Sequence, residues 1–310
     1  MNNLIITRNA DIQTSGINAD LLERFIRYLD VSPKSVSTYS RSLRQFMNYL
    51  SLNGITNPTR EDLIAWREGL KIDHKPTTVQ TYITSVRLFF KWTEQEGIYP
   101  NIASHLKGAK INRNHKRDYL TSSQLKKVLA GIDRSTEEGR RNYAICLLMT
   151  VGGLRTIEVT RAKVEDLRTL GDGVILNVQG KGREERSEYI NVPDEVETAI
   201  RESLADRTDN TGDKPLFISL SNNSKGEPLT TRSVSGIIKK ILVSAGFNSD
   251  KWTGHSLRHS AITLAINEGN SLQDVRQFAR HTDVSTTMIY FHEQERINNK
   301  CERTIANALF

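Results

Sequence analysis

The chain has 310 residues, a hydrophobic content of 37% and a charged content of 25%, which indicate a globular protein with room for two cores and argue against disorder. Its net charge of +7 favours a polyanionic partner. Two cysteines are too few for a disulfide framework, and no apolar run reaches the roughly 18 residues of a membrane span. The first residues lack the basic start and apolar core of a secretory signal. We therefore expect a cytoplasmic protein with no membrane partner.

An internal echo marks the N-terminal third. A pattern of Val, Tyr, Ser, an aliphatic residue, Arg, Phe and a final aromatic residue starts at Val36 and recurs at Val79, with a constant offset of 43 residues. Each copy has a proline three residues before its valine, Pro33 and Pro76, which suits the first turn of a helix. Because the apolar members recur at helical spacing, we predict that each copy is a helix with these members in the core.

The two copies also share an arginine that lies off the apolar stripe, Arg44 in the first and Arg87 in the second. Each is a candidate for a DNA phosphate contact, and each is equally well explained as a solvated surface residue. Apolar stripes before the first copy and between the copies add a helix each. We therefore predict an irregular lead-in at residues 1–16 and a four-helix domain at residues 17–105.

Most of the excess positive charge lies between the two halves of the chain. Residues 1–105 have a net charge of +2, residues 118–310 have a net charge of zero, and residues 106–117 carry the remaining +5. A short basic segment of this kind is either a solvated linker or a strap along a phosphate backbone. Its basic residues are Lys107, Lys110, Arg113, Lys116 and Arg117.

We expect a second domain at residues 118–292. An apolar helix at residues 140–150 is ended by Gly152 and Gly153, which place Arg155 at the start of the next helix. The first backbone amides of a helix attract anions, so an arginine at this point strengthens a phosphate site.

Two strands follow, at residues 173–178 and 188–192, and they are expected to pair as a hairpin around Lys181. A lysine in such a turn is either a solvated tip or a group that reaches into a groove. A later helix at residues 230–243 holds further candidates for contacts with the DNA backbone, namely Arg232, Lys239 and Lys240.

The segment from His255 to His292 has the densest set of chemically active side chains. His255 and Arg258 are three residues apart, so they share a face if the segment is helical. His281 and Tyr290 follow after a second apolar-periodic stretch. Arginine binds phosphate oxygens in a bidentate manner, histidine moves a proton near neutral pH, and tyrosine can be a covalent nucleophile. Together they indicate a site that binds and attacks a phosphodiester.

This order of residues resembles the tyrosine recombinase (phage integrase) family. The family also needs an upstream arginine, and Arg155 lies in a Gly-Leu-Arg-x-x-Glu box that Glu158 completes. It further needs a hairpin lysine, which Lys181 matches. The resemblance implies a mainly α fold with a small β-sheet in the C-terminal domain. It implies a two-domain, C-shaped DNA clamp, in which a four-helix core-binding domain joins an α+β catalytic domain.

The resemblance further implies a site-specific recombinase that cuts and rejoins DNA strands through a 3′-phosphotyrosyl intermediate. Because the bond energy is kept in that intermediate, no cofactor is expected. The implied partners are double-stranded DNA with a specific recombination site and three further copies of the chain. The resemblance implies a homo-tetramer on synapsed DNA and a monomer free in solution. The implied roles are nucleophile for Tyr290, phosphate stabilisation for Arg155 and Arg258, general acid for Lys181, base or phosphate donor for His255, and positioning for His281.

The sequence departs from the family pattern at Arg280. Where Leu-Gly-His is usual, this chain has Ala279, Arg280 and His281. The added arginine is expected either to contact a phosphate or to change the local turn. Residues 293–310 are expected to form a tail helix whose apolar stripe packs on its own domain or docks on a neighbouring subunit.

A zinc site is the first alternative, because His255 and His259 are four residues apart. The metalloprotease pattern needs a glutamate after the first histidine, and Ser256 stands there. We therefore expect no metal and interpret His259 as a packed or hydrogen-bonded helper next to Arg258. Two rival functions remain, a non-catalytic DNA-binding regulatory relative and a type IB topoisomerase. The sequence does not separate integration of a mobile element from dimer resolution.

Overall fold

The structure, a computed structural model, describes residues 16–111, 119–180 and 185–310. The chain divides between residues 115 and 116 into two units. This division falls within the segment that the sequence indicates as a basic linker. Of the basic residues in that segment, Arg113, Lys116 and Arg117 lie outside the described residues.

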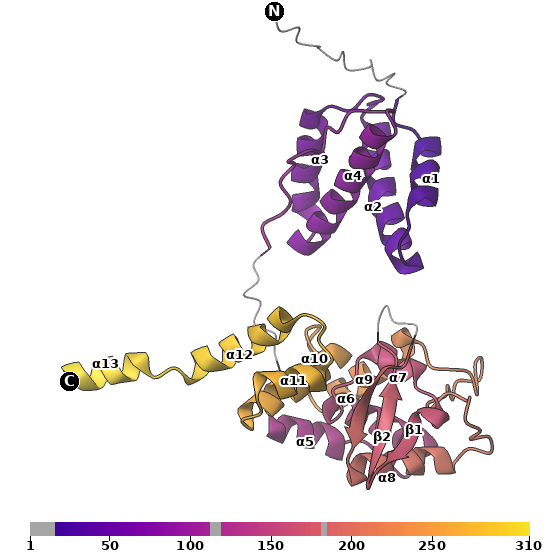
Figure 1. Cartoon of the computed structure of the whole chain (residues 1–310), viewed down its shortest axis with the longest axis vertical. Helices are drawn as coiled ribbons and strands as arrows, with labels where there is room; N and C mark the ends of the chain where they lie inside the picture. The colour runs from indigo at the N-terminus through magenta and orange to yellow at the C-terminus, as the bar shows by residue number, and fades with distance from the viewer. Residues whose placement is uncertain (1–15, 112–118, 181–184) are drawn as a thin grey trace, which may run out of the picture. The chain divides into compact units, whose positions relative to one another are not determined.

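The N-terminal unit is helical, as predicted (Figure 1). The two copies of the repeated pattern form helices of 20 residues each, and each helix has its proline in the first turn. The first three helices of the unit are each preceded by a residue whose side chain accepts a hydrogen bond from the backbone of the first turn, namely Asn18, Ser32 and Thr59. The helices are α1 (Ala19–Tyr28), α2 (Pro33–Leu52), α3 (Arg60–Asp73) and α4 (Pro76–Gln95).

Aromatic rings fill the core of this unit. Phe25 meets Phe89 edge to face at 5.4 Å between ring centroids, and Phe46 meets Trp66 at 4.9 Å. These four side chains come from four different helices, so the rings join the whole unit into one core.

The second unit has a small antiparallel sheet among helices (Figure 1), so the predicted fold class of a mainly α protein with a small sheet is confirmed. The helices before the sheet are α5 (Ser122–Ala130), α6 (Glu137–Thr150), α7 (Thr156–Arg161) and the 3-10 turn η1 (Val164–Asp166). The strands are β1 (Leu167–Leu170), β2 (Gly173–Val178) and β3 (Glu188–Val192). The helices after the sheet are α8 (Asp194–Ala205), α9 (Thr231–Ser244), α10 (Gly254–Asn267), α11 (Leu272–Ala279), α12 (Val284–Asn298) and α13 (Cys301–Leu309).

The sheet has the order β1-β2-β3, and the predicted hairpin is its β2–β3 pair, with Leu176 opposite Ile190. β1 was not predicted. It has four residues and is mostly exposed, so it lacks the apolar alternation by which a strand is recognised. The sheet lies on one core with α6, whose residues from Ala144 to Met149 are all buried.

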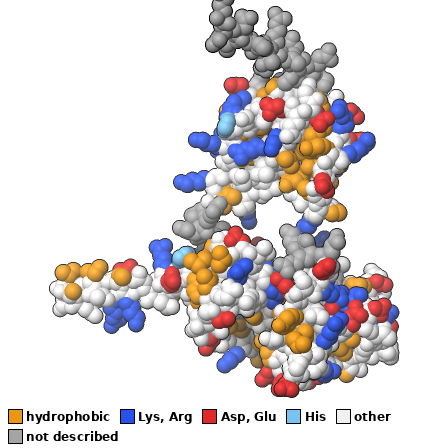
Figure 2. Space-filling view, in the orientation of Figure 1, with side chains coloured by type: hydrophobic (Ala, Val, Ile, Leu, Met, Phe, Trp, Pro, Cys, Tyr) orange, Lys and Arg blue, Asp and Glu red, His pale blue; other side chains and the backbone are white. Residues whose placement is uncertain are grey.

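The end of the chain differs from expectation. Tyr290 lies in the middle of α12, which continues to Asn298 without a break at residue 292. α13 buries none of its residues, and Figure 2 shows a row of hydrophobic side chains along it. The tail stripe therefore does not pack on its own unit. None of the described helices is both long and apolar enough to cross a membrane.

Candidate active site

Arg155 begins α7 directly after a double-glycine turn. Gly153 has a φ of +59°, and a β-carbon added to it would lie 2.8 Å from the ring of Phe278 on α11. This position therefore needs glycine for its backbone and for the close approach of α11. The Arg155 backbone N–H donates to the carboxylate of Glu158 at 2.8 Å and closes the first turn of the helix. The predicted helix start is confirmed, but its first amide is bound by Glu158.

Arg258 lies on the buried face of α10, with 3% of its surface exposed. Its guanidinium donates hydrogen bonds to the carbonyl oxygens of Gly153 and Ala279, and thus joins the double-glycine turn to the end of α11. Arg155 also donates to the Ala279 carbonyl, at 3.4 Å. The two arginines, 103 residues apart in the sequence, therefore converge on one point of the molecule.

Arg155, Arg258, Arg280, Glu158 and Tyr290 form a cluster in which positive charge exceeds negative charge. Burial, followed by the positive charges of Arg155 and Arg280, lowers the pKa of Arg258 to about 9. Glu158 and Tyr290 act in the opposite direction and do not offset this. The phenol of Tyr290 is thus close enough for its charge to act on Arg258. The cluster lacks negative charge, which a bound phosphate would supply.

The side chain of Arg280 lies inside the unit. Only 2% of its side chain is exposed, and its guanidinium binds the carboxylate of Glu158 at 2.9 Å. Its backbone has a φ of +50°, and its side chain turns inward after the end of α11. Both terminal nitrogens of its guanidinium are engaged within the unit, whereas its buried Nε has no hydrogen-bond partner among the described residues, so a direct phosphate contact stays a prediction. The other acceptors of the terminal nitrogens are the carbonyl oxygens of Gly152, Gly153 and Phe278.

Tyr290 is buried, with its hydroxyl oxygen hydrogen-bonded to Nδ1 of His259. The ring of His281 stacks beside Tyr290 at 6.3 Å between centroids, and its Nδ1 pairs with the Thr287 hydroxyl at 2.9 Å. On the other side, His255 meets the ring of His259 edge to face at 5.0 Å. The three histidines and the tyrosine thus form one continuous row.

Lys181 lies outside the described residues, so its position is not part of this geometry. The residue before it, Gly180, accepts a hydrogen bond from Arg161 at 2.9 Å. Arg161 is the last residue of α7, the short helix that Arg155 begins. The base of the hairpin is therefore tied to the element that carries the first arginine.

The other predicted DNA contacts differ in exposure. Lys239 is half-buried, and its ammonium group donates to the Ser249 carbonyl at 2.6 Å, so it holds the loop before α10 and is not free for a phosphate in this structure. Arg87 is half-buried in the N-terminal unit. The exposed candidates are Arg44, Lys107, Lys110, Arg232 and Lys240.

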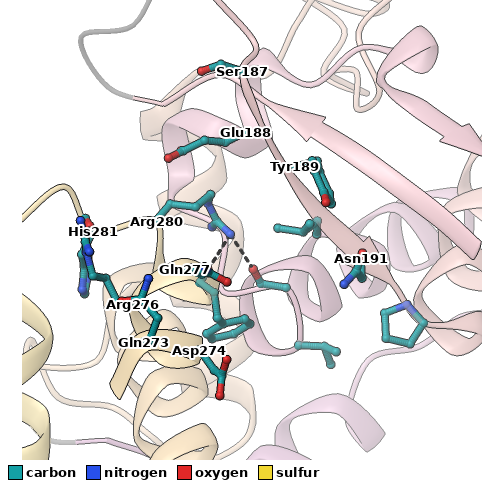
Figure 3. A pocket seen from close by; sticks show the side chains of 15 residues that line it. Ser187, Glu188, Tyr189, Asn191, Gln273, Asp274, Arg276, Gln277, Arg280 and His281 are labelled. Carbon is teal, nitrogen blue, oxygen red and sulfur yellow. Dashed lines mark hydrogen bonds between the residues drawn. The ribbon is translucent and has the colours of Figure 1, made fainter. Parts of the chain in front are cut away.

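An open groove of about 770 Å³ borders the cluster. Figure 3 shows Arg280 and His281 on one side of it, with Tyr189 and Asn191 of β3 opposite. The residues of α11 line its floor. Of the cluster, Arg280 and His281 line this groove, whereas Arg155, Arg258 and Tyr290 are not among its lining residues.

The sequence did not indicate the roles of Glu158 and His259 in this geometry. Glu158 was part of the family box, but its bridge to Arg280 spans 122 residues and has no local signal. His259, next to Arg258, was expected to be packed or hydrogen-bonded, and it is hydrogen-bonded, with Tyr290 as a partner that the sequence did not indicate. The sequence feature that could have indicated the position of His259 is its four-residue spacing from His255, since this spacing places both rings on one side of α10.

The arrangement can hold a tetrahedral anion and attack it. Arg155, Arg258 and Arg280 share the single carboxylate of Glu158, so the cluster has an excess of positive charge, and Tyr290 provides an oxygen nucleophile within the same cluster. Among residues 16–111, 119–180 and 185–310, no group of three or more His, Cys, Asp or Glu side chains is placed to hold a metal ion. A metal-free reaction stays an expectation.

Comparison with known proteins follows the same division. Residues 118–296 match the Phage integrase family, and residues 22–97 match the Phage integrase N-terminal SAM-like domain. The chain is 29% identical over 290 residues to tyrosine recombinase XerD of Listeria monocytogenes, covering 88% of this chain and 94% of that protein. XerH site-specific recombinase bound to its difH substrate shares the fold, with a TM-score of 0.72 and 22% identity over 90% of this chain and 82% of that one. The Tn1549 transposon integrase bound to transposon-end DNA does so with a TM-score of 0.68 and 18% identity over 88% and 93%.

Proposed function

This chain belongs to the phage integrase family, and we propose that it is a site-specific recombinase that cuts and rejoins DNA strands with Tyr290 as its nucleophile. The observation that supports this best is the convergence of Arg155, Arg258 and Tyr290 at a point where positive charge exceeds the single carboxylate of Glu158. A protein that only binds DNA needs no tyrosine in such a place. A scissile phosphate supplies the missing charge.

In the proposed cleavage, the Tyr290 hydroxyl gives its proton to the adjacent row of histidines, and its oxygen bonds to phosphorus as the bond from phosphorus to the 5′ oxygen breaks. The products are a 3′-phosphotyrosyl bond and a 5′-hydroxyl. Arg155 and Arg258 stabilise the charge that grows on the non-bridging oxygens. Lys181 gives its ammonium proton to the leaving oxygen, because an alkoxide is a poor leaving group. The 5′-hydroxyl of another strand then reverses the step.

His255, His259 and His281 position Tyr290 and take part in its proton transfer. His259 holds the Tyr290 hydroxyl through Nδ1, and His281 supports the other side of the tyrosine ring. We assign to His255 the role of base or phosphate donor, because it lies at the exposed end of the row. His281 has a positioning role, since its own Nδ1 is bound by Thr287.

We also propose that the enzyme acts in the cytoplasm on double-stranded DNA. Exchange between two duplexes breaks four strands, and one tyrosine serves each strand, so four copies are needed. The two units would close around the duplex as a clamp, with the exposed basic residues on the phosphate backbone. The unpaired apolar stripe of α13, which includes Ile305 and Leu309, would dock on a neighbouring copy.

The test begins with genomic fragments of the source organism, because the cognate site is unknown. Protein–DNA adducts that survive denaturation are captured and sequenced, and the recovered sequence is made into a nicked suicide duplex. Wild type should form a covalent adduct on it, and Tyr290→Phe should form none. An adduct of Tyr290→Phe would show that the nucleophile is another residue. Adducts on every sequence alike would favour a topoisomerase.

Lys181 is tested on the same duplex. Lys181→Ala should cleave slowly, because the 5′ oxygen then leaves without a proton. A 5′-bridging sulfur at the scissile position is a better leaving group and should restore the rate. Failure of this rescue, with Tyr290 still forming the adduct, would remove the general-acid role of Lys181.

A further inference from the structure

Arg280 is buried inside the catalytic unit, where both terminal nitrogens of its guanidinium are hydrogen-bonded and its Nε has no partner among the described residues. Two of its guanidinium nitrogens bind the Glu158 carboxylate at 2.9 Å, the Gly153 carbonyl at 2.9 Å and the Phe278 carbonyl at 2.8 Å. Phe278 precedes it on α11, whereas Gly153 and Glu158 come from the double-glycine turn and α7. The side chain is therefore a clamp between two segments that are far apart in the sequence.

Those two segments carry the reacting groups. Arg155 follows the double-glycine turn, and His281 follows Arg280. The carbonyl oxygen of Arg280 also accepts a hydrogen bond from Arg155 at 3.1 Å. Its left-handed backbone, with a φ of +50°, directs both the carbonyl and the side chain toward the cluster.

Glu158 links Arg280 to Arg155. Its side chain is completely buried, with one oxygen 2.7 Å from the Arg155 guanidinium and the other 2.9 Å from Arg280. Burial by itself raises the pKa of Glu158, but the charge of Arg280 heads the opposing contributions that hold this pKa below its usual value. The Arg280 charge thus favours the carboxylate form that anchors Arg155.

We propose that Arg280 is a positioning residue for the recombination reaction: through Glu158 and the double-glycine turn, it sets the direction of Arg155 toward the scissile phosphate. The inference rests on the proposed function and deepens it. Arg280 does not touch the substrate. It acts through a buried carboxylate that it shares with Arg155.

The central variant is Arg280→Gly, because glycine keeps the left-handed backbone and removes only the side chain. On the suicide duplex we expect cleavage to slow by about 10- to 100-fold, the order that a small displacement of a catalytic group produces. Arg280→Lys should be intermediate, since it keeps the charge without the fork of donors. The matched control is Arg201→Gln, which removes an exposed arginine paired with Glu197 on α8 and should cleave like wild type.

Two readouts separate positioning from other roles. DNA affinity and its salt dependence should be unchanged in Arg280→Gly, whereas a weaker affinity with a smaller salt slope would show a direct phosphate contact and overturn the proposal. A methylphosphonate at the scissile position removes the charge that Arg155 stabilises. On that substrate, the rates of wild type and Arg280→Gly should converge, whereas a gap as large as before would show that the defect is one of stability only.

A double-mutant cycle with Glu158→Gln guards against a variant that fails to fold, because Glu158→Gln/Arg280→Gln removes both partners of the buried Glu158–Arg280 ion pair together. In the Glu158→Gln background, Arg280→Gln should have little further effect on cleavage, and a full additive loss would overturn the proposal. If wild type forms no Tyr290-dependent adduct, the proposed function fails. If wild type does form it and Arg280→Gly cleaves equally fast, only the role of Arg280 fails.

Discussion

The two units place their charges in opposite ways. Among the described residues of the N-terminal unit, the buried side chains are apolar, aromatic or hydroxyl-bearing, and its arginines are exposed or half-buried. The catalytic unit instead buries Arg258, Arg280 and Glu158 within a few ångströms of one another. Burying unpaired charge destabilises a fold, and here three guanidinium groups surround one carboxylate. The catalytic unit therefore has a buried excess of positive charge that suits a bound anion. The N-terminal unit has its positive charge nearer the surface.

The largest expected effect comes from the buried charge. Arg258→Gln should slow cleavage of the suicide duplex by about 10³-fold, because one preorganised donor to the growing phosphate charge is lost. DNA affinity should change much less, since most of the binding energy comes from other phosphate contacts. Single-turnover adduct formation and a binding titration measure the two quantities. A parallel loss of both would show that Arg258 serves binding and not the transition state.

The next largest effect is expected from the aromatic core of the N-terminal unit, where a substitution should lower stability without changing the cleavage rate. Phe89→Ala should lower the free energy of unfolding of the N-terminal unit by about 3 kcal/mol, because Phe89 is fully buried between Phe25 and Trp92. Denaturant unfolding followed by tryptophan fluorescence measures this loss. At a temperature where the variant is folded, its cleavage rate at saturating protein should equal that of wild type. A slower rate under those conditions would show that the core also shapes the active site.

How far the sequence predicts each unit follows from this contrast. In the N-terminal unit, the repeated stripe and the prolines at Pro33 and Pro76 are local signals, and the helices they predict are present. In the catalytic unit, the order of residues identified the family box, and a double glycine located the helix start at Arg155. The inward turn of Arg280 was not predictable, because an arginine after a helix usually faces solvent. Its acceptors become visible only when α7 and α11 are folded together.

An exposed arginine should have a smaller effect than a buried one. Arg44→Gln on α2 is expected to weaken DNA binding by several-fold and to lower the salt slope by about one, if Arg44 contacts a single phosphate. Cleavage at saturating protein should stay at the wild-type rate. Arg41→Gln, one turn earlier on the same helix and also exposed, is the matched control. Equal affinities for the two variants and wild type would show that Arg44 is only solvated surface.

The smallest expected effect tests whether the cluster around Arg258 binds an anion. Sulfate has the charge and shape of a phosphate group, and at roughly five times its Kd it should stabilise the catalytic unit by about 1 kcal/mol relative to chloride of equal ionic strength. Amide hydrogen exchange should show added protection in α10 and none in α4. The response should be absent in Arg258→Gln.

The pH dependence of this stabilisation follows from Arg258, whose pKa is lowered from its ordinary value of 12.5 to about 9. A base with a lowered folded pKa destabilises the fold while it is protonated, and this penalty declines as the pH rises from that folded value toward the unfolded one. The proton is also what attracts sulfate. Sulfate protection should therefore be full near neutral pH and decline above about pH 9, as the unliganded cluster gives up its proton. Protection that is equal at neutral pH and above about pH 9 and that persists in Arg258→Gln would place the sulfate elsewhere. The contrast between the two units would then not include an anion site at Arg258.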